Sequence, residues 1–180
     1  MFSVIKNIVK KKLSSDFSRN VLTLVSGTSV AQLIPFVAAP ILSRIFAPED
    51  FGFLALYLSI AQILGAIATG RYEMAIILPK KNENAIRLVL ISVLLSLIFA
   101  LFVLFAVIFG GSRLASVLGD ERLSNWFYLL PISVFMIGSY NALSYYHIRR
   151  KRFGIVASAT AFKSLGGVSI QLLLGVGEFI

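Results

Sequence analysis

The sequence predicts an all-α integral membrane protein with five transmembrane helices. Hydrophobic residues make up 58% of the 180 positions. Charged residues make up only 14%, whereas soluble globular domains average about 25%. So short a chain could not bury this much apolar surface in a soluble core. The charges also fall mainly between long apolar segments. The composition therefore indicates a protein that is embedded in a lipid bilayer.

The first 19 residues form a basic segment ahead of the first apolar run. Its lysines are interleaved with apolar residues at helical spacing, which are Phe2, Ile5, Val9 and Leu13. This pattern fits a short amphipathic helix on the anionic inner leaflet of a membrane, and a solvated tail fits it equally well. In either case we expect residues 1–19 to be cytoplasmic.

Residues 20–180 are expected to form the transmembrane domain. A bilayer core of about 30 Å requires roughly 20 helical residues. Four uncharged runs reach this length, and a fifth is interrupted only by Lys163. The predicted spans cover about residues 21–45, 51–70, 88–110, 123–146 and 153–178.

The loop charges predict the orientation of these spans. Cytoplasmic loops of membrane proteins carry an excess of Lys and Arg. With the N-terminus inside, thirteen of the seventeen basic residues are cytoplasmic: Lys6, Lys10, Lys11, Lys12, Arg19, Arg71, Lys80, Lys81, Arg87, Arg149, Arg150, Lys151 and Arg152. The net charge of +9 is therefore interpreted as a topology signal, and we expect no nucleic-acid partner.

Sequence patterns of common enzyme chemistry are missing. The chain has no cysteine, which excludes disulfides and thiolate metal sites, and His147 is its single histidine. It also has no glycine-rich phosphate-binding loop and no paired metal-ligand histidines. We therefore expect no enzyme activity, no cofactor and no bound metal.

Ionisable side chains in the spans are the best candidates for functional residues, since each costs about 2.5 kcal/mol or more at mid-depth. Lys163 lies ten residues beyond Phe153, or about 15 Å along a helix. Its charge therefore calls for water, an anionic ligand or a carboxylate nearby. Arg71 and Glu73 close the second span and are spaced too closely to pair well; interfacial and submerged positions fit them equally. Arg44 fits a snorkelling anchor at the outer end of the first span.

Small residues at helical spacing predict close helix packing. Gly27 with Ala31, and Ala61 with Gly65, are the clearest pairs. Since small residues abound in any membrane bundle, we interpret these pairs as packing positions rather than as a functional site.

Two motifs carry a resemblance to a known family. PILSRIFAPEDFG at residues 40–52 and GRYEMAIILPK at residues 70–80 resemble the opening of the Wzx-like oligosaccharide flippases of the MOP transporter superfamily. The likeness extends over essentially the whole chain in span order and loop charge. Arg44, Arg71 and Glu73 lie within the two motifs, whereas Lys163 is proposed from its depth alone.

The resemblance implies a MOP- or MATE-like helical bundle in the bacterial inner membrane. It implies that the chain flips an undecaprenyl-pyrophosphate-linked oligosaccharide outward for O-antigen or capsule synthesis, and that membrane lipid and other polysaccharide assembly proteins are its partners. Basic residues would meet the pyrophosphate, so the implied substrate-binding residues are Arg44, Arg71 and Glu73, with Lys163 added by our own inference.

The chain differs from the family in its number of spans. It has five predicted spans, whereas members of the family have about twelve or more, arranged in two related halves. We therefore expect an incomplete first half, an N-terminal fragment that does not transport by itself. Two alternatives remain. One is a fragment of a MATE-type drug or cation antiporter. Such ion-coupled transporters generally use a carboxylate deep in the membrane, and the nearest candidate in this chain is Glu73, at a span end. The other is a small membrane scaffold that transports nothing.

Overall fold

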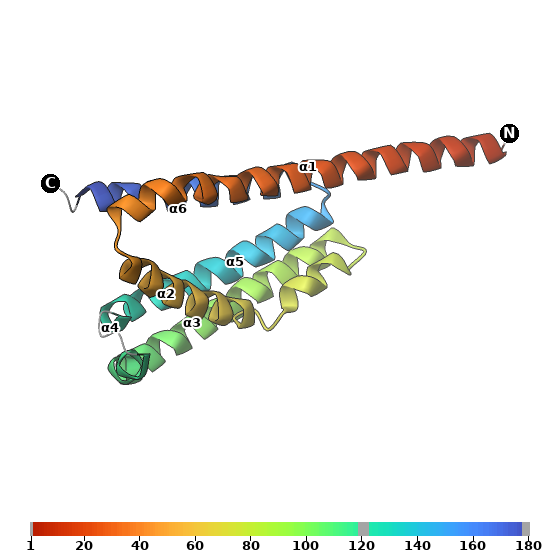
Figure 1. Cartoon of the computed structure of the whole chain (residues 1–180). Coiled ribbons are helices and arrows are strands. Elements are labelled where there is room, and N and C mark those ends of the chain that lie inside the picture. The colour runs from red at the N-terminus through yellow and green to blue at the C-terminus, as the bar shows by residue number, and fades with distance from the viewer. Residues whose placement is uncertain (1, 119–122, 178–180) are drawn as a thin grey trace. The chain divides into compact units, whose positions relative to one another are not determined.

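The computed structural model describes residues 2–118 and 123–177, and all regular elements in these ranges are helical (Figure 1). In chain order they are α1 (Phe2–Ile45), α2 (Pro48–Ile67), the 3-10 helix η1 (Tyr72–Ile77), α3 (Asn82–Leu118), α4 (Leu123–Trp126), the 3-10 helix η2 (Phe127–Leu129), α5 (Leu130–Arg149) and α6 (Phe153–Gly177).

Five helical stretches in the described residues are long and apolar enough to cross a membrane. They are Val21–Ile45, Pro48–Ile67, Asn82–Gly111, Leu123–Arg149 and Phe153–Leu173. The predicted all-helical class with five candidate spans is thereby confirmed, and the chain is a multi-pass membrane protein. The cytoplasmic placement of the N-terminus stays a prediction.

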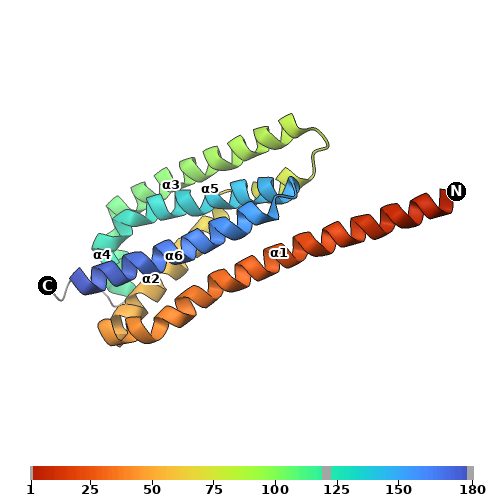
Figure 2. The same cartoon turned by 90° about the horizontal axis from the view of Figure 1, so that it is seen from above.

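The chain forms two compact units. One contains α1 and α6, and the other runs from Ala47 to Arg149. In the first unit α1 and α6 run parallel, side by side (Figures 1 and 2). A Cβ built on Gly27 would lie only 2.5 Å from the Cβ of Ala157, so the helices touch where glycine has no side chain. Ala31, one turn further along α1, is fully buried. The packing role predicted for Gly27 and Ala31 is confirmed.

Helix α1 is longer than its predicted span. Its backbone is helical from Phe2, so the basic segment is neither a separate helix nor an irregular tail but continues into the first span. Arg44 lies in the last turn, as predicted for the end of this span.

The end of α2 is earlier than predicted, at Ile67 rather than at residue 70. Gly70 and Arg71 both have positive φ angles, of 57° and 62°, which a right-handed helix does not accommodate. The amide of Gly70 donates to the carbonyl of Ile67 at 2.7 Å, and that of Tyr72 donates to Thr69 at 3.1 Å. This tight turn starts η1 in place of a continued α-helix.

The other helices also differ from the predicted boundaries. Helix α3 extends over Asn82–Leu118, beyond residues 88–110. The predicted fourth span, 123–146, consists of α4, η2 and α5 in succession. Pro131 has no N–H to donate to the carbonyl of Phe127, and it lies in the first turn of α5, directly after the 3-10 segment. The predicted fifth span ends at residue 178, outside the described residues.

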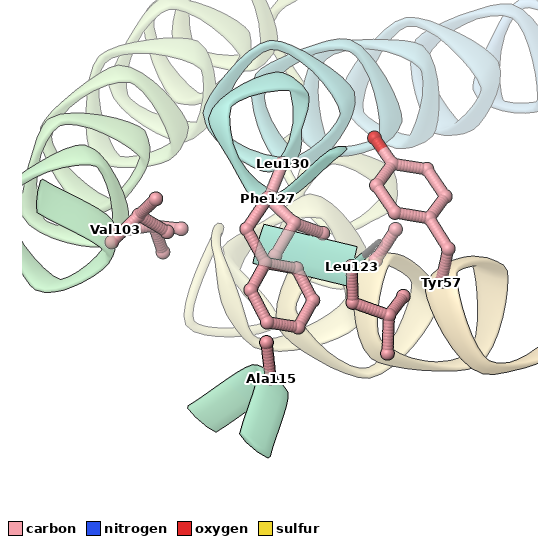
Figure 3. Packing of buried hydrophobic residues seen from close by; sticks show 8 residues of the cluster. Tyr57, Val103, Ala115, Leu123, Phe127 and Leu130 are labelled. Carbon is pink, nitrogen blue, oxygen red and sulfur yellow. The ribbon is translucent and has the colours of Figure 1, made fainter. Parts of the chain in front are cut away.

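The apolar core of the second unit lies where α2, α3 and the α4–η2 segment meet. Figure 3 shows the ring of the fully buried Phe127 pointing toward Ala115, with Leu123 beside it. Close by, a Cβ on Gly65 would lie 2.6 Å from Cγ2 of Ile137, so α2 approaches α5 closely. Ala61, one turn before Gly65, is 1% exposed. The second predicted packing pair is thus confirmed as well.

Candidate functional site

The interior of the second unit contains a carboxylate. Glu73 is 2% exposed, and no other charged side chain among those the structure describes is buried. It lies on η1, which packs against both α3 and α5. The left-handed turn at Gly70 and Arg71 is what directs this short helix back into the bundle.

A small polar centre surrounds Glu73. The hydroxyl of Thr69, itself fully buried, donates a hydrogen bond to Oε2 of Glu73. A Cβ built on Gly138 would lie 3.3 Å from Cγ2 of Thr69 and 2.8 Å from Cβ of Ser96. Thr69, Ser96 and Gly138 therefore meet at one level of the bundle.

Ser92 is another fully buried serine of α3, the helix against which η1 packs. Thr69 precedes Glu73 by four residues and lies at the level of Ser96 on α3. Ile76 follows Glu73 by three residues and packs with Ala85 on α3. Ser92 lies between Ala85 and Ser96 on the same buried face of α3. The chain from Thr69 to Ile76 therefore runs along the stretch of α3 that includes Ser92.

The polar centre is deep in the bundle. Arg149 ends α5, and its guanidinium donates to Asn82 Oδ1 at 2.9 Å and to the Pro79 carbonyl at 2.7 Å, which marks the polar end of the unit. Gly138 lies eleven residues before Arg149, or about 16 Å along the helix axis. Glu73 lies on η1, beyond the end of the candidate span Pro48–Ile67, but its carboxylate is buried among the helices of the unit. A buried charged group in a membrane protein is a candidate functional residue.

Two hydroxyls of this region have no hydrogen-bond partner among the described residues. They are the buried Oγ atoms of Ser92 and Ser139. Helical hydroxyls elsewhere in the chain bond to a carbonyl one turn back: Thr28 to Leu24, Ser59 to Ala55 and Thr160 to Val156. Ser92 and Ser139 make no such bond.

The chemistry of the centre is that of hard oxygen ligands. It offers one carboxylate and several hydroxyls, which can bind a small cation or hydrogen-bond to hydroxyl groups. In the part of the chain that the structure describes, no group of three or more His, Cys, Asp or Glu could hold a metal ion. His147, nine residues beyond Gly138 and about 13 Å along α5, stands against Tyr146 with ring centroids 5.8 Å apart, away from the centre.

Arg71 and Glu73 have different environments. Arg71 is exposed, whereas Glu73 is buried. Glu73 is enclosed by the helices of the unit and Arg71 is not; the depth of either residue in the membrane stays a prediction.

Lys163 and Arg44 belong to the other unit. Both are exposed. The contact of Gly27 with Ala157 sets the register of α1 and α6. Lys163 lies six residues beyond Ala157, and Arg44 lies seventeen beyond Gly27, so the two are separated by about 16 Å along the parallel axes. The structure does not bring these two cations together.

Sequence reasoning missed Thr69 and Gly138 as members of the centre. A signal for part of it was visible, because Ser92 and Ser96 are the only polar residues of the predicted span 88–110 and lie one helical turn apart. No such signal marks Thr69 or Gly138, whose roles depend on how η1 packs.

Comparisons with known proteins identify the family. No curated protein and no solved structure matches the chain. The family model described as polysaccharide biosynthesis protein matches residues 17–174, nearly the whole chain. This match covers well over half of the chain, and the chain therefore belongs to the polysaccharide biosynthesis protein family.

Proposed function

We propose that the chain takes part in moving an undecaprenyl-pyrophosphate-linked oligosaccharide from the inner to the outer leaflet of the bacterial inner membrane, for O-antigen or capsule synthesis. The observation that carries this proposal is the match to a polysaccharide biosynthesis family over a chain with five candidate membrane spans. Membership of this family in a chain with candidate membrane spans supports a sugar-bearing substrate at the membrane, and a lipid-linked sugar is our candidate for it.

The polar groups support a role in passage of the sugar. Crossing the bilayer requires hydrogen bonds that replace water around the sugar hydroxyls, since unpaired polar groups are costly in an apolar medium. Lys163, Arg71 and Arg44 are cations that can meet the pyrophosphate. Translocation breaks no covalent bond, so the proposal requires no enzyme active site, cofactor or metal.

A second candidate function is ion-coupled export by a MATE-type antiporter. The buried Glu73 favours this function, because ion-coupled transporters generally use a carboxylate inside the membrane. From the sequence alone Glu73 was only the nearest candidate, at a span end; its burial against α3 and α5 adds support. The family match and the basic candidates Lys163 and Arg71 still favour an anionic, sugar-bearing substrate.

The test is to delete the codons for this chain in its native cell. We expect the lipid-linked oligosaccharide to accumulate with its sugar facing the cytoplasm, measured by glycosidase accessibility in inverted and right-side-out membrane vesicles. Surface polysaccharide should fall, and returning the codons to their native position should restore it. Unchanged polysaccharide together with lost efflux of a cationic dye would support the antiporter instead.

A further inference from the structure

We propose that residues 72–81, which we call the connecting segment, form a docking surface for anionic phospholipid. Exposed apolar side chains of the segment enter the bilayer interface, and two lysines beside them bind the phosphate headgroups. The candidate spans on either side end at Ile67 and begin at Asn82, so the segment lies outside both. It belongs wholly to the unit Ala47–Arg149. The proposal goes beyond the proposed function and does not depend on the chain moving a lipid-linked sugar.

The 3-10 geometry of η1 separates an inner row of side chains from two outer rows. Because a 3-10 helix has about three residues per turn, side chains three apart in sequence line up along it. Glu73 and Ile76 form the inner row, which is buried in the bundle. The outer rows, continued by the residue directly after η1, consist of exposed apolar side chains: Tyr72, Met74, Ile77 and Leu78.

These apolar side chains call for a partner outside the protein. Leu78 is 80% exposed. A single exposed leucine is ordinary on a protein surface, but the exposed apolar side chains here occur together, within residues 72–78, and they lie beyond the ends of the spans. A segment at the boundary between membrane and water buries such side chains among the headgroups and the upper acyl chains.

Two lysines indicate the charge of the partner. Lys80 and Lys81 directly follow the apolar side chains, and both are exposed. On α3, the exposed Glu83 and Arg87 are one turn apart and offset each other, so the positive charge of the segment comes from the lysines. Apolar side chains beside lysines match a surface that offers acyl chains and negative headgroups together. Anionic phospholipid is such a surface.

Arg149 holds the backbone that carries the lysines. Its guanidinium donates to the carbonyl of Pro79 at 2.7 Å, to that of Lys80 at 3.5 Å and to Oδ1 of Asn82 at 2.9 Å. Arg149 thus uses its donors within the protein, and the lysines are the cations that reach the headgroups. A surface that is already ordered loses less conformational entropy when it binds.

The test uses a fluorophore on a single cysteine, since the chain has none of its own. Leu78→Cys is labelled and placed in nanodiscs of phosphatidylcholine alone, or of phosphatidylcholine and phosphatidylglycerol in equal parts. Quenching by acrylamide, which is water-soluble and uncharged, is the readout. We expect several-fold weaker quenching in the mixture, and loss of most of this protection at high salt, which screens the attraction. Equal quenching in the two lipids would overturn the proposal.

Matched variants assign the protection to the two lysines. Lys80→Gln combined with Lys81→Gln should remove most of the effect of phosphatidylglycerol. Arg113→Gln removes an exposed cation from the other end of α3 and should leave the effect intact. A label at Val117→Cys, an 83% exposed position outside the span Asn82–Gly111, should be quenched equally in both lipids. Full protection in the double glutamine variant would contradict the role of the lysines.

The positions of the substitutions keep the test decisive. Lys80, Lys81 and Leu78 are all exposed, so their replacement should not disturb folding, which circular dichroism checks. Met74→Cys, on the other outer row of η1, gives the same readout if the label at residue 78 disturbs the chain.

The lipid carrier is the alternative source of phosphate. Protection that requires undecaprenyl pyrophosphate in phosphatidylcholine nanodiscs, with none from phosphatidylglycerol, would assign the surface to the carrier and overturn the proposal. Protection by phosphatidylglycerol in a chain whose deletion leaves surface polysaccharide unchanged would support the docking surface and count against the proposed function alone.

Discussion

Gly138 on α5 lies directly against Ser96 on α3. A Cβ built on Gly138 would lie 2.8 Å from the Cβ of Ser96 and closer still to its hydroxyl oxygen, with Cγ2 of Thr69 at 3.3 Å. A real Cβ does not approach another carbon so closely. The absence of a side chain at residue 138 therefore permits the close packing of α3 and α5 that encloses the polar centre.

Gly138→Ala should destabilise the protein. Overpacking a tight core costs about 1–3 kcal/mol, and here two helices would have to separate. Gly110→Ala is the matched control, since a Cβ at that helical position meets nothing within 4 Å; it should be neutral or stabilising by up to about 1 kcal/mol. Chemical unfolding in mixed micelles measures both. Equal stability of the two variants would contradict the close contact.

The hydrogen bond between Tyr57 and Ser133 should couple α2 to α5. Their hydroxyl oxygens are 2.7 Å apart. Interhelical hydrogen bonds in membranes contribute about 0.6 kcal/mol on average and up to about 2 kcal/mol. Tyr57→Phe and Ser133→Ala should each lower the unfolding free energy by that amount, and the double variant should lose less than the sum. Tyr72→Phe, which changes an exposed tyrosine, is the control. Strict additivity would contradict the coupling.

Arg149 should hold the connection between η1 and α3 in place. Its guanidinium donates to Asn82 Oδ1 and to the carbonyls of Pro79 and Lys80. Arg149→Ala should raise the rate of tryptic cleavage after Lys80 several-fold, because cleavage requires local opening. Arg149→Lys should rescue it only in part, since an ammonium cannot reproduce the fork of a guanidinium.

Arg150→Ala is the control for the Arg149 variants, because Arg150 is exposed and is not among the donors to this connection. It should leave the cleavage rate after Lys80 unchanged. Peptides identified by mass spectrometry distinguish this site from the lost site at the substituted arginine. The same cleavage rate in Arg149→Ala as in the wild type would show that the contact does not stabilise the loop.

Reporter fusions test the orientation predicted from the loop charges. A reporter fused after Lys81 or after Arg152 should be cytoplasmic, and one fused after Leu118, at the end of α3, should be on the opposite side. Paired phosphatase and fluorescent-protein fusions give opposite signals at each point. The inverse pattern would overturn the cytoplasmic placement of the N-terminus.

The spans were predictable because membrane insertion depends on a one-dimensional property, an apolar run of sufficient length. The ends of the helices depend on local geometry instead. A positive φ angle is common for a glycine such as Gly70, but Arg71 adopts one as well. An arginine in the sequence does not signal that conformation. The prediction therefore extended α2 to residue 70.

The burial of Glu73 was beyond sequence reasoning for a similar reason. A hydropathy pattern places Glu73 at a span end, and only the packing of η1 between α3 and α5 takes it inside. Ser92 and Ser96 were visible as polar residues in an apolar run. The contacts of Gly138 with Ser96 and Thr69 join distant parts of the chain, which periodicity does not encode.

Lys163 is predicted to hold the anionic head of the lipid carrier. It lies ten residues beyond the start of α6 and is exposed, which places its charge about 15 Å into the span. A lysine at that depth is costly without water or an anion, and an ammonium can serve as a point-charge phosphate binder. Lys163→Met keeps the apolar stem and removes the charge, so it should improve membrane insertion while it lowers surface polysaccharide in the native cell.

Lys163→Arg is the matched variant, because it keeps the charge and should preserve much of the polysaccharide. Phe162→Met, the same replacement at the adjacent exposed position, controls for the methionine itself. All variants must be compared at equal membrane abundance, since a change in insertion alone would alter the yield. Reduced polysaccharide in Lys163→Met but not in the other two supports an electrostatic role. If Lys163→Met retains the full amount, the charge is merely tolerated in α6 and the anion is bound elsewhere.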